Sequence, residues 1–289
     1  MPELPEVEVV KRSLEKKILN LVIKDVKIVE GSLRYKLNKY KILKLKGKRF
    51  KRICRRSKFL IFFTNHDQLM LVHLGMTGKF FFLNKKHKKF KTSFYYELDH
   101  KKDQKHNRVI FFFNNNEKLI YNDVRKFGFI KFYNLRNFSK CLHLSGLGPE
   151  PLKKDWSTEY FRNYILGRNR TIKDILMDQK FVSGLGNIYV NEILFMSKIS
   201  PTRKVLNLKN FEIDKIVKNT KKILKRAIDK GGSSIKDFSS DSGKKGLFQQ
   251  HFNVYGKEGE KCSNTDCNKS IIRIFVSNRS TFFCKRCQK

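Results

Sequence analysis

The N-terminal residues have the types needed for covalent chemistry on a sugar. The chain begins Met1-Pro2-Glu3, and removal of the initiator methionine would leave the secondary amine of Pro2 as the N-terminus. An α-amino group titrates near about pH 8, so part of it is neutral at physiological pH and nucleophilic. A secondary amine can attack an electrophilic sugar carbon and form an iminium. The alternative is that Pro2 only permits methionine removal and Pro5 starts a helix.

Four cysteines near the C-terminus have the spacing of a metal site. Four residues separate Cys262 from Cys267, two separate Cys284 from Cys287, and sixteen lie between the pairs. This pattern predicts one structural zinc ion on a β-hairpin, with coincidence or another metal as the alternatives. The metal would fold a tail that has little core of its own. Arg279, inside the hairpin, would then be held rigidly enough to grip a phosphate bidentately, the alternative being a solvated arginine.

The charge of the chain indicates a polyanionic partner. The 289 residues include 64 Lys and Arg but only 26 Asp and Glu, which gives a formal net charge of +38. Such a surface predicts salt-sensitive phosphate contacts, although a lysine-rich genome would give part of the charge without function. No stretch approaches about 18 apolar residues, and no signal peptide is present, so we expect a cytosolic protein. Six cysteines in that compartment argue against a disulfide framework.

The first half of the chain must position Pro2. Residues 5–20 have helical periodicity, which predicts an amphipathic helix behind the N-terminus. Short runs rich in Val, Ile, Phe and Tyr follow, and they predict strands of a sandwich or barrel. These runs are 21–29, 59–64, 69–74, 92–98, 109–113, 118–122 and 127–133. The basic segment 84–108 is interpreted as a solvated loop or hairpin extension.

The second half has helical patterning. After a Gly- and Pro-rich linker at 146–151, helices are predicted at 157–166, 171–179, 188–197 and 211–229. The turn from Val182 to Asn187 exposes backbone N–H groups at a helix start and suits a phosphate, with a plain helix-hairpin turn as the alternative. It lacks the third glycine and the preceding strand of a dinucleotide fingerprint.

These features predict a multidomain α+β protein in four segments. Residues 1–140 would form an N-terminal β-sandwich and 150–232 a helical domain. Residues 233–247 would form a mobile loop and linker, and 248–289 the zinc finger. The resemblance described next implies that the first is the catalytic domain, the second the DNA-binding domain and the third the lesion loop.

Seven motifs, in order, resemble the bacterial formamidopyrimidine-DNA glycosylase family over nearly the whole chain. They are Met1-Pro2-Glu3-Leu4-Pro5-Glu6-Val7-Glu8, Ser57-Lys58-Phe59-Leu60, His73-Leu74-Gly75-Met76-Thr77-Gly78, Asp123-Val124-Arg125-Lys126-Phe127-Gly128, Gly184-Leu185-Gly186-Asn187-Ile188-Tyr189, Gly231-Gly232-Ser233-Ser234-Ile235-Lys236-Asp237-Phe238 and the cysteine hairpin with Asn278-Arg279-Ser280-Thr281-Phe282. The resemblance implies an N-terminal β-sandwich with a helix, a helix-two-turns-helix domain and a β-hairpin zinc finger.

The resemblance also implies a bifunctional DNA glycosylase and lyase of base-excision repair, acting on 8-oxoguanine opposite cytosine and on formamidopyrimidines. Pro2 would attack C1′ while Glu3 protonates the deoxyribose ring oxygen, and β- and δ-eliminations would follow from the iminium. Lys58 would contact the lesion and its phosphate. The resemblance also places Arg279 among the catalytic residues, with Pro2, Glu3 and Lys58.

The same resemblance assigns residues to the DNA. Met76, Arg125 and Phe127 would fill the space left by the extruded base, with Arg125 reading the orphaned cytosine. Asn187 and Arg279 would hold the flanking phosphates, and His106 is placed among the DNA contacts. The loop at 231–246 would close over the extruded base. The expected partner is double-stranded DNA with a damaged base, bound by a monomer that carries one zinc ion and no other cofactor.

The sequence departs from the family pattern in three places. The first cysteine pair usually has two intervening residues, Val124 and Lys126 replace the usual proline and arginine, and the 84–108 segment is long. Arg125 is therefore the candidate in its turn for reading cytosine.

Two other functions fit part of the sequence. An endonuclease VIII-like glycosylase would act on oxidised pyrimidines, but Leu4 and the set of Met76, Arg125 and Phe127 favour the purine enzyme. A non-catalytic zinc-finger protein would bind DNA or RNA through charge alone, but the retained Pro2, Glu3 and Lys58 speak against it.

Overall fold

The computed structural model forms two compact units and describes the whole chain except residues 66, 84–88, 92–103 and 234–246. The first unit comprises Met1–Ser145 with Lys230–Gln249, and the second comprises Gly146–Asp229 with Gln250–Lys289. The four segment bounds given above stay a prediction. Among the described residues, no helix is long and apolar enough to cross a membrane.

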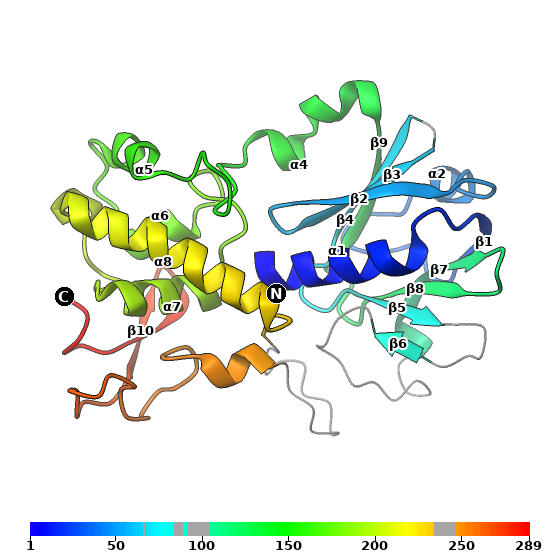
Figure 1. The fold of residues 1–289 in the computed structure, drawn as a ribbon. Helices are drawn as coiled ribbons and strands as arrows, with labels where there is room; N and C mark the ends of the chain where they lie inside the picture. The colour runs from blue at the N-terminus through cyan, green and yellow to red at the C-terminus, as the bar shows by residue number, and fades with distance from the viewer. Residues whose placement is uncertain (66, 84–88, 92–103, 234–246) are drawn as a thin grey trace. The chain divides into compact units, whose positions relative to one another are not determined.

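The first unit begins with helix α1 (Leu4–Ile18), which confirms the predicted N-terminal helix (Figure 1). Its buried face carries Val7, Val10, Leu14 and Ile18 at helical spacing and packs against β2 (Phe50–Arg56) and β3 (Phe59–Thr64). The helix ends two residues earlier than predicted because Leu19 is extended and Asn20 is left-handed.

Two antiparallel sheets follow, and they confirm the predicted β-sandwich. The five-stranded sheet has the order β1-β7-β8-β5-β6, and the four-stranded sheet has the order β2-β3-β4-β9. The remaining bounds are β1 (Ile23–Ile28), α2 (Lys39–Leu43), β4 (Gln68–His73), β5 (Lys79–Leu83), β6 (Lys89–Lys91), β7 (Asn107–Phe113), β8 (Lys118–Asn122) and β9 (Phe129–Asn134).

Aromatic side chains fill the space between the two sheets. The ring of Phe50 lies 6.2 Å from that of Phe111, and the ring of Phe62 lies 5.9 Å from that of Phe80. All four are at most 2% exposed. Each such burial contributes about 1.5–3 kcal/mol to folding. The outer face of the four-stranded sheet is covered by the segment that holds η2 (Leu135–Lys140) and α4 (Leu142–Ser145), through the buried Cys141.

The strand pattern corrects several sequence expectations. Strands β2, β5 and β6 had not been predicted, while the expected strand at 92–98 lies outside the described residues. The strand expected at 127–133 begins only at Phe129, because Lys126 has a left-handed backbone (φ 58°) within a turn. Pairing of β6 with β5 confirms a hairpin in the 84–108 segment, of which 84–88 and 92–103 are not described.

The second unit is helical, with a β-hairpin near the C-terminus. Its four predicted helices are confirmed as α5 (Thr158–Ile165), α6 (Ile172–Met177), α7 (Asn187–Ser197) and α8 (Asn210–Asp229). Strands β10 (Ile272–Val276) and β11 (Arg279–Phe283) pair in antiparallel fashion. Ser277 and Asn278 join them, both with positive φ as a type I′ turn requires.

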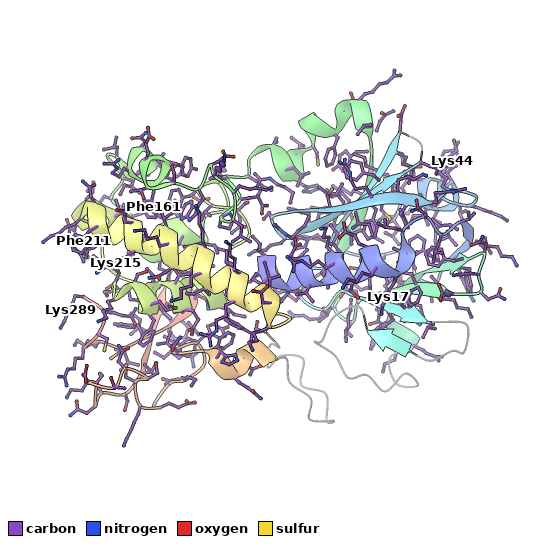
Figure 2. The ribbon with its side chains drawn as sticks, in the orientation of Figure 1. Lys17, Lys44, Phe161, Phe211, Lys215 and Lys289 are labelled. Atoms are coloured by element: carbon purple, nitrogen blue, oxygen red, sulfur yellow. The ribbon has the colours of Figure 1, made fainter. Side chains whose placement is uncertain are left out.

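Several lysine ammonium groups lie close to aromatic rings, among them those of Lys17, Lys44 and Lys215, which are labelled in Figure 2. The Nζ atom of Lys44 lies 4.3 Å from the ring centroid of Tyr40, and that of Lys215 lies 5.0 Å from the ring of Phe211. Lys17 lies 5.4 Å from the ring of Phe82, and burial lowers its pKa. Lys44 and Lys215 therefore shield exposed aromatic rings, whereas Lys17 lies at the buried ring of Phe82 and its ammonium is partly desolvated.

Candidate functional site

The start of α1 fixes Pro2 and Glu3 in the first unit. Glu3 is 3% exposed and caps the helix: its side chain accepts from the amide of Glu6, and its own amide donates to Oε2 of Glu6 at 2.7 Å. The other oxygen of Glu6 accepts from the amide and hydroxyl of Ser233 at 3.0 and 3.2 Å. Pro2, which is buried, precedes this capping box. The predicted lesion loop begins beside Ser233, but residues 234–246 of it lie outside the described part of the chain.

Lys58 follows a tight turn between β2 and β3. Ser57 adopts a φ of 55°, and Lys58 is only 6% exposed. Its charge also acts on His73: burial, with smaller contributions from Lys58, Arg34, His143 and the N-terminal ammonium, lowers the pKa of His73 to about 4. Lys58 and the N-terminus are therefore electrostatic neighbours of His73.

Met76 and Arg125 belong to two turns that are bonded together. We call them the 75–78 turn and the 123–128 turn. The Oγ1 atom of Thr77 accepts from the Arg125 amide at 2.9 Å and donates to Oδ1 of Asp123. The other oxygen of Asp123 accepts from the amide of Gly128 at 2.8 Å. Because Asp123 is fully buried, these bonds hold the two turns in one arrangement.

Gly75 permits the close approach of these turns. Its φ is 61°, and a Cβ there would lie 2.4 Å from the carbonyl carbon of Phe127. Its amide donates to Nδ1 of His73 at 3.1 Å, which requires a neutral imidazole with Nδ1 unprotonated. A larger residue at 75 would push the two turns apart.

Three predicted DNA-contact residues are presented on this pair of turns. Met76 is half-buried, Arg125 is exposed, and Phe127 is 45% exposed. The Arg125 guanidinium lies 4.5 Å from the centroid of the Phe127 ring. His106 is bonded to the base of the 123–128 turn: its carbonyl accepts a hydrogen bond from the amide of Asp123 at 3.0 Å. An exposed Phe127 does not serve the core, whereas its position suits insertion between bases.

Asn187 and Arg279 are brought together in the second unit. Asn187 is the first residue of α7, the end of the helix dipole that favours an anion, and its Nδ2 atom donates to the carbonyl of Ser280 at 2.9 Å. Arg279 is exposed at the start of β11. The hairpin is held further by Asn191, whose side-chain oxygen accepts from the amide of Phe282 at 2.8 Å.

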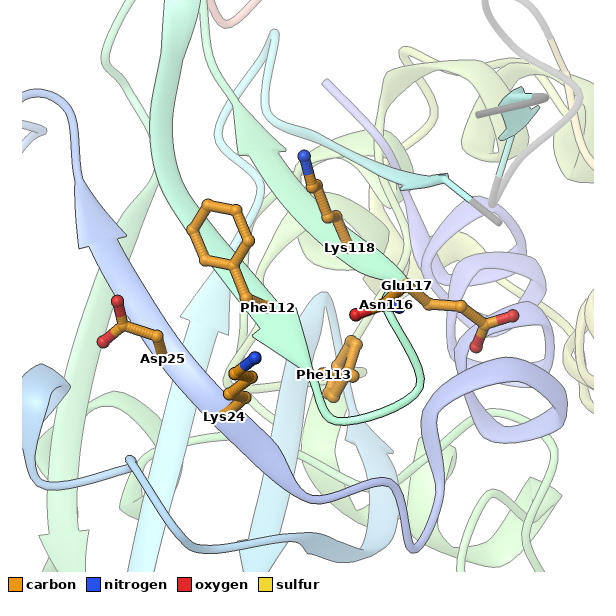
Figure 3. Close-up of a pocket in the computed structure, with 7 residues that line it drawn as sticks. All are labelled: Lys24, Asp25, Phe112, Phe113, Asn116, Glu117 and Lys118. Atoms are coloured by element: carbon orange, nitrogen blue, oxygen red, sulfur yellow. The ribbon is translucent and has the colours of Figure 1, made fainter. Parts of the chain in front are cut away.

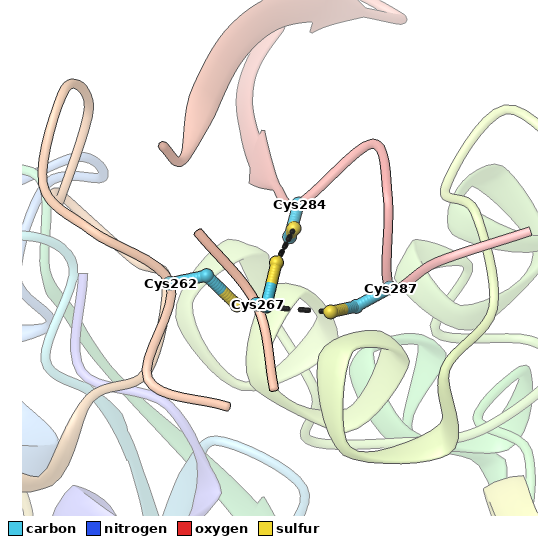
Figure 4. Close-up of side chains that lie close together, drawn as sticks. All are labelled: Cys262, Cys267, Cys284 and Cys287. Atoms are coloured by element: carbon cyan, nitrogen blue, oxygen red, sulfur yellow. Dashed lines mark hydrogen bonds between the residues drawn. The ribbon is translucent and has the colours of Figure 1, made fainter. Parts of the chain in front are cut away.

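The four C-terminal cysteines form one cluster (Figure 4). Their sulfur atoms lie within 4.8 Å of one another, with 3.8 Å between Cys262 and Cys287 and 3.6 Å between Cys267 and Cys284. A tetrahedral site with metal–sulfur bonds of about 2.3 Å needs sulfur separations of about 3.8 Å. The amide of Lys269 lowers the pKa of the Cys267 thiol to about 7, whereas burial raises the pKa of the Cys262 and Cys287 thiols, so the sulfur separations carry the argument for a metal. The cluster fits one metal ion.

Several residues that support these sites were not singled out from the sequence. Thr77, Asp123 and Ser233 join turns that are far apart in the chain. Lys173, which is 1% exposed, donates to the carbonyl of Ser280 at 3.3 Å and to the hydroxyl of Thr281; burial lowers its pKa to about 8. Glu192 accepts four hydrogen bonds from residues 253–255 and so attaches the C-terminal segment to α7.

A hollow of about 500 Å³ elsewhere in the first unit has no predicted site residue in its lining (Figure 3). Its walls come from β1 and the β7–β8 turn, among them Lys24, Asp25 and Glu117. Charges of both signs share the rim. We assign no role in DNA chemistry to this hollow.

Comparison with known sequences gives the family. The family model for the formamidopyrimidine-DNA glycosylase N-terminal domain matches residues 1–130, and that for the formamidopyrimidine-DNA glycosylase H2TH domain matches residues 147–239. The formamidopyrimidine-DNA glycosylase of Rickettsia felis is 38% identical over 289 residues, which cover 100% of this chain and 98% of the relative. That of Roseobacter denitrificans is 38% identical, with 100% of both chains covered.

Solved structures agree with the sequence comparison. A Lactococcus lactis Fpg variant bound to DNA containing Fapy-dG superposes with a TM-score of 0.85 at 34% identity, covering 100% of both chains. The Lactococcus lactis Fpg bound to DNA with an abasic site gives 0.84 at 33% identity, covering 99% of both. Fold and sequence thus define a DNA glycosylase. The chain belongs to the formamidopyrimidine-DNA glycosylase family.

Proposed function

We propose that this chain is a bifunctional DNA glycosylase and lyase that removes 8-oxoguanine opposite cytosine and formamidopyrimidines from double-stranded DNA. The observation that carries the proposal is the buried Pro2-Glu3 pair at the start of α1, in a chain that belongs to this family. The binding of DNA containing Fapy-dG by the Lactococcus lactis relative supports the substrate class.

The chemistry follows from the residue types. With Met1 removed, the neutral amine of Pro2 attacks C1′ of the damaged nucleoside, and the bond from C1′ to the base nitrogen breaks. Glu3 gives its proton to the ring oxygen O4′, which opens the sugar. The amine proton passes to the departing base, and the nitrogen lone pair expels the protonated O4′ from C1′, which leaves an iminium between Pro2 and C1′. The iminium acidifies C2′, so β-elimination releases the 3′ phosphate and δ-elimination then releases the 5′ phosphate.

Base extrusion leaves a space that the two joined turns are suited to fill. Extrusion costs a few kcal/mol of stacking and pairing, which inserted side chains partly restore. Met76 offers an adaptable thioether and Phe127 an aromatic wedge. Arg125, stacked on Phe127, offers several donors for the orphaned cytosine. Lys58 would bind the phosphate of the lesion. Its charge and that of the N-terminus both act on His73.

Phosphate binding by the second unit rests on Asn187 and Arg279. The helix start at Asn187 favours an anion, and Arg279 can bind a phosphate bidentately. We propose zinc as the metal of the cysteine cluster because four thiolates at these separations suit a tetrahedral ion. Bound there, zinc would fix the hairpin that carries Arg279.

The proposal is tested by comparing substrates at equal enzyme excess. Single-turnover excision is measured on duplexes that carry 8-oxoguanine, a formamidopyrimidine or thymine glycol, each in the presence of EDTA. We expect the oxidised purines to be released faster. Faster release of thymine glycol would favour the second candidate, an oxidised-pyrimidine glycosylase, which has support from a Lactococcus lactis Fpg complex with DNA containing an oxidised pyrimidine. Binding without excision would leave a non-catalytic DNA binder.

A further inference from the structure

Glu30 lies beneath the 123–128 turn and pairs with two cations. It follows β1, and the amides of Val29 and Glu30 both donate to the carbonyl of Arg108, at 2.9 and 3.3 Å. Its Oε2 atom accepts from Nζ of Lys126 at 2.6 Å and from Nη1 of Arg108 at 3.3 Å. One carboxylate oxygen therefore joins the end of β1 to the start of β7 and to the turn.

Arg108 carries this connection to the base of the turn. Its side chain is 5% exposed, and its Nε atom donates to the carbonyl of Asp123 at 2.9 Å. A buried guanidinium needs a carboxylate partner, and Glu30 is its ion-pair partner. Loss of the Glu30 charge would therefore disturb a cation that is bonded directly to the 123–128 turn.

Lys126 occupies the middle of the turn in a left-handed conformation with φ 58°. This backbone conformation is unfavourable for a residue with a Cβ, so contacts with the surrounding residues must stabilise it. The ion pair with Glu30 gives Lys126 a fixed partner, and Lys126 in turn keeps the pKa of Glu30 below its usual range. The neighbours Arg125 and Phe127 remain exposed, with the guanidinium over the ring.

Lys126 is also a potential competitor of Arg125. Both are long cations with hydrogen-bond donors, they are adjacent in the turn, and either could reach toward a base or a phosphate once free. A carboxylate that holds Lys126 at 2.6 Å removes this competition. The consequence concerns which base is accepted opposite the lesion, rather than the chemistry at the sugar.

We infer that Glu30 is a positioning residue for opposite-base recognition: by holding Lys126, it leaves Arg125 as the side chain that reads the base opposite the lesion. This inference rests on the proposed function. It concerns a residue that does not touch the reacting atoms, so its loss should change discrimination between opposite bases more than the rate of strand cleavage.

The test compares Glu30→Gln with Glu117→Gln, an acid of the same unit in the β7–β8 turn that bonds to Asn115. Single-turnover excision of 8-oxoguanine is measured opposite cytosine and opposite adenine, together with cleavage of an abasic site. For Glu30→Gln we expect the cytosine-to-adenine rate ratio to fall roughly three- to tenfold, part of what a bidentate base contact supplies. Abasic-site cleavage should stay within about twofold, and Glu117→Gln should match the native protein in both assays.

A second variant separates the two effects of Glu30. If free Lys126 competes with Arg125, adding Lys126→Met to Glu30→Gln should restore the ratio. An unchanged ratio in Glu30→Gln, or a lowered ratio that Lys126→Met does not restore, would overturn the inference. Absence of excision by the native protein on the duplex with cytosine opposite the lesion would instead refute the proposed function, so the two failures are distinguishable.

Discussion

The hydroxyl of Thr77 accepts a hydrogen bond from the amide of Arg125 at 2.9 Å and thereby joins the turn that carries Met76 to the turn that carries Phe127. The same hydroxyl donates to the buried carboxylate of Asp123. Thr77 therefore contributes to the mutual placement of the three side chains proposed to fill one space in the DNA. Thr77 is only 5% exposed, so its hydroxyl makes these two bonds inside the protein and not with water.

Replacing Thr77 by valine tests this dependence. Thr77→Val keeps the shape but leaves Asp123 without one donor, so we expect the free energy of unfolding to fall by about 1–3 kcal/mol. Excision opposite cytosine should slow as well. Urea unfolding and single-turnover excision measure the two effects. Thr64→Val is the control, because Thr64 donates to the Gln68 carbonyl away from these turns. Equal excision rates in both variants would show that the Thr77 bonds do not position the DNA contacts.

Acid should weaken the 75–78 turn through His73. The pKa of His73 is lowered to about 4, whereas an unfolded histidine titrates near about 6.5, so the unfolded state binds more protons between these values. Stability is therefore fully present above about pH 6.5 and is lost as the pH falls toward 4, by up to about 3 kcal/mol. Protonation of Nδ1 also breaks its bond with the Gly75 amide.

The measurement is urea unfolding at pH 7 and pH 4.5 for the native protein and for His73→Gln. We expect the native protein to lose more stability on acidification than the variant does. Arg34, Lys58, His143 and the N-terminal ammonium are the charges that act on the imidazole, and each opposes its protonation. An identical loss in both proteins would mean that His73 is not the group responsible.

Removing one thiolate should release the metal and weaken DNA binding. Structural zinc contributes on the order of 10 kcal/mol to the folding of small fingers, so Cys284→Ser should lower both the zinc content and the affinity for DNA. Elemental analysis and a binding titration measure these effects. Cys54→Ser is the control, since Cys54 lies in β2 of the other unit. Full zinc content in Cys284→Ser would contradict ligation by this cluster.

We expect Arg279 to contribute to DNA affinity independently of the base sequence of the duplex. Arg279→Gln is expected to weaken binding to damaged and undamaged duplexes alike and to reduce the slope of log K against log salt concentration by about one. Arg273→Gln is the matched control on the same hairpin, where Arg273 pairs with Glu258 at 3.6 Å. Titrations at several salt concentrations measure both. Equal slopes for the two variants would remove Arg279 from the phosphate contacts.

The sequence was informative where chemistry or periodicity is local. Cysteine spacing predicted which four sulfur atoms gather, because a metal site on a hairpin needs two close pairs. Helix α8 was predicted within one residue, since its apolar positions repeat over 20 residues. Pro5 was predicted in the first turn of a helix, and the structure has it in the first turn of α1.

Long-range hydrogen bonds were not accessible from sequence patterns. The bond from Ser233 to Glu6 spans 227 residues, and that from Lys126 to Glu30 spans 96. Strand β2 was missed because charged residues dominate it: Phe50 and Ile53 are its only two fully buried side chains, so no alternating pattern is visible. Phe127 was assigned to the DNA contacts through the family resemblance, whereas its 45% exposure could not be read from the sequence pattern.

An N-terminal tag that blocks Pro2 should abolish excision while leaving DNA binding in place, because the proposed nucleophile is the free amine. Removal of the tag, with Pro2 as the first residue, should restore activity. Excision rates and binding are measured on the same 8-oxoguanine duplex before and after removal. Full activity with the tag attached would contradict a terminal amine as the nucleophile.

Borohydride trapping tests the central claim most directly. The native protein, Pro2→Gly and the control Pro5→Ala are incubated with borohydride and a duplex that carries one 8-oxoguanine opposite cytosine. Borohydride reduces an iminium to a stable amine, so we predict a covalent protein–DNA adduct with the native protein and with Pro5→Ala, much diminished with Pro2→Gly. No adduct from a native protein whose methionine has been removed and which binds the duplex, or equal adduct from Pro2→Gly, would contradict the proposed role of Pro2.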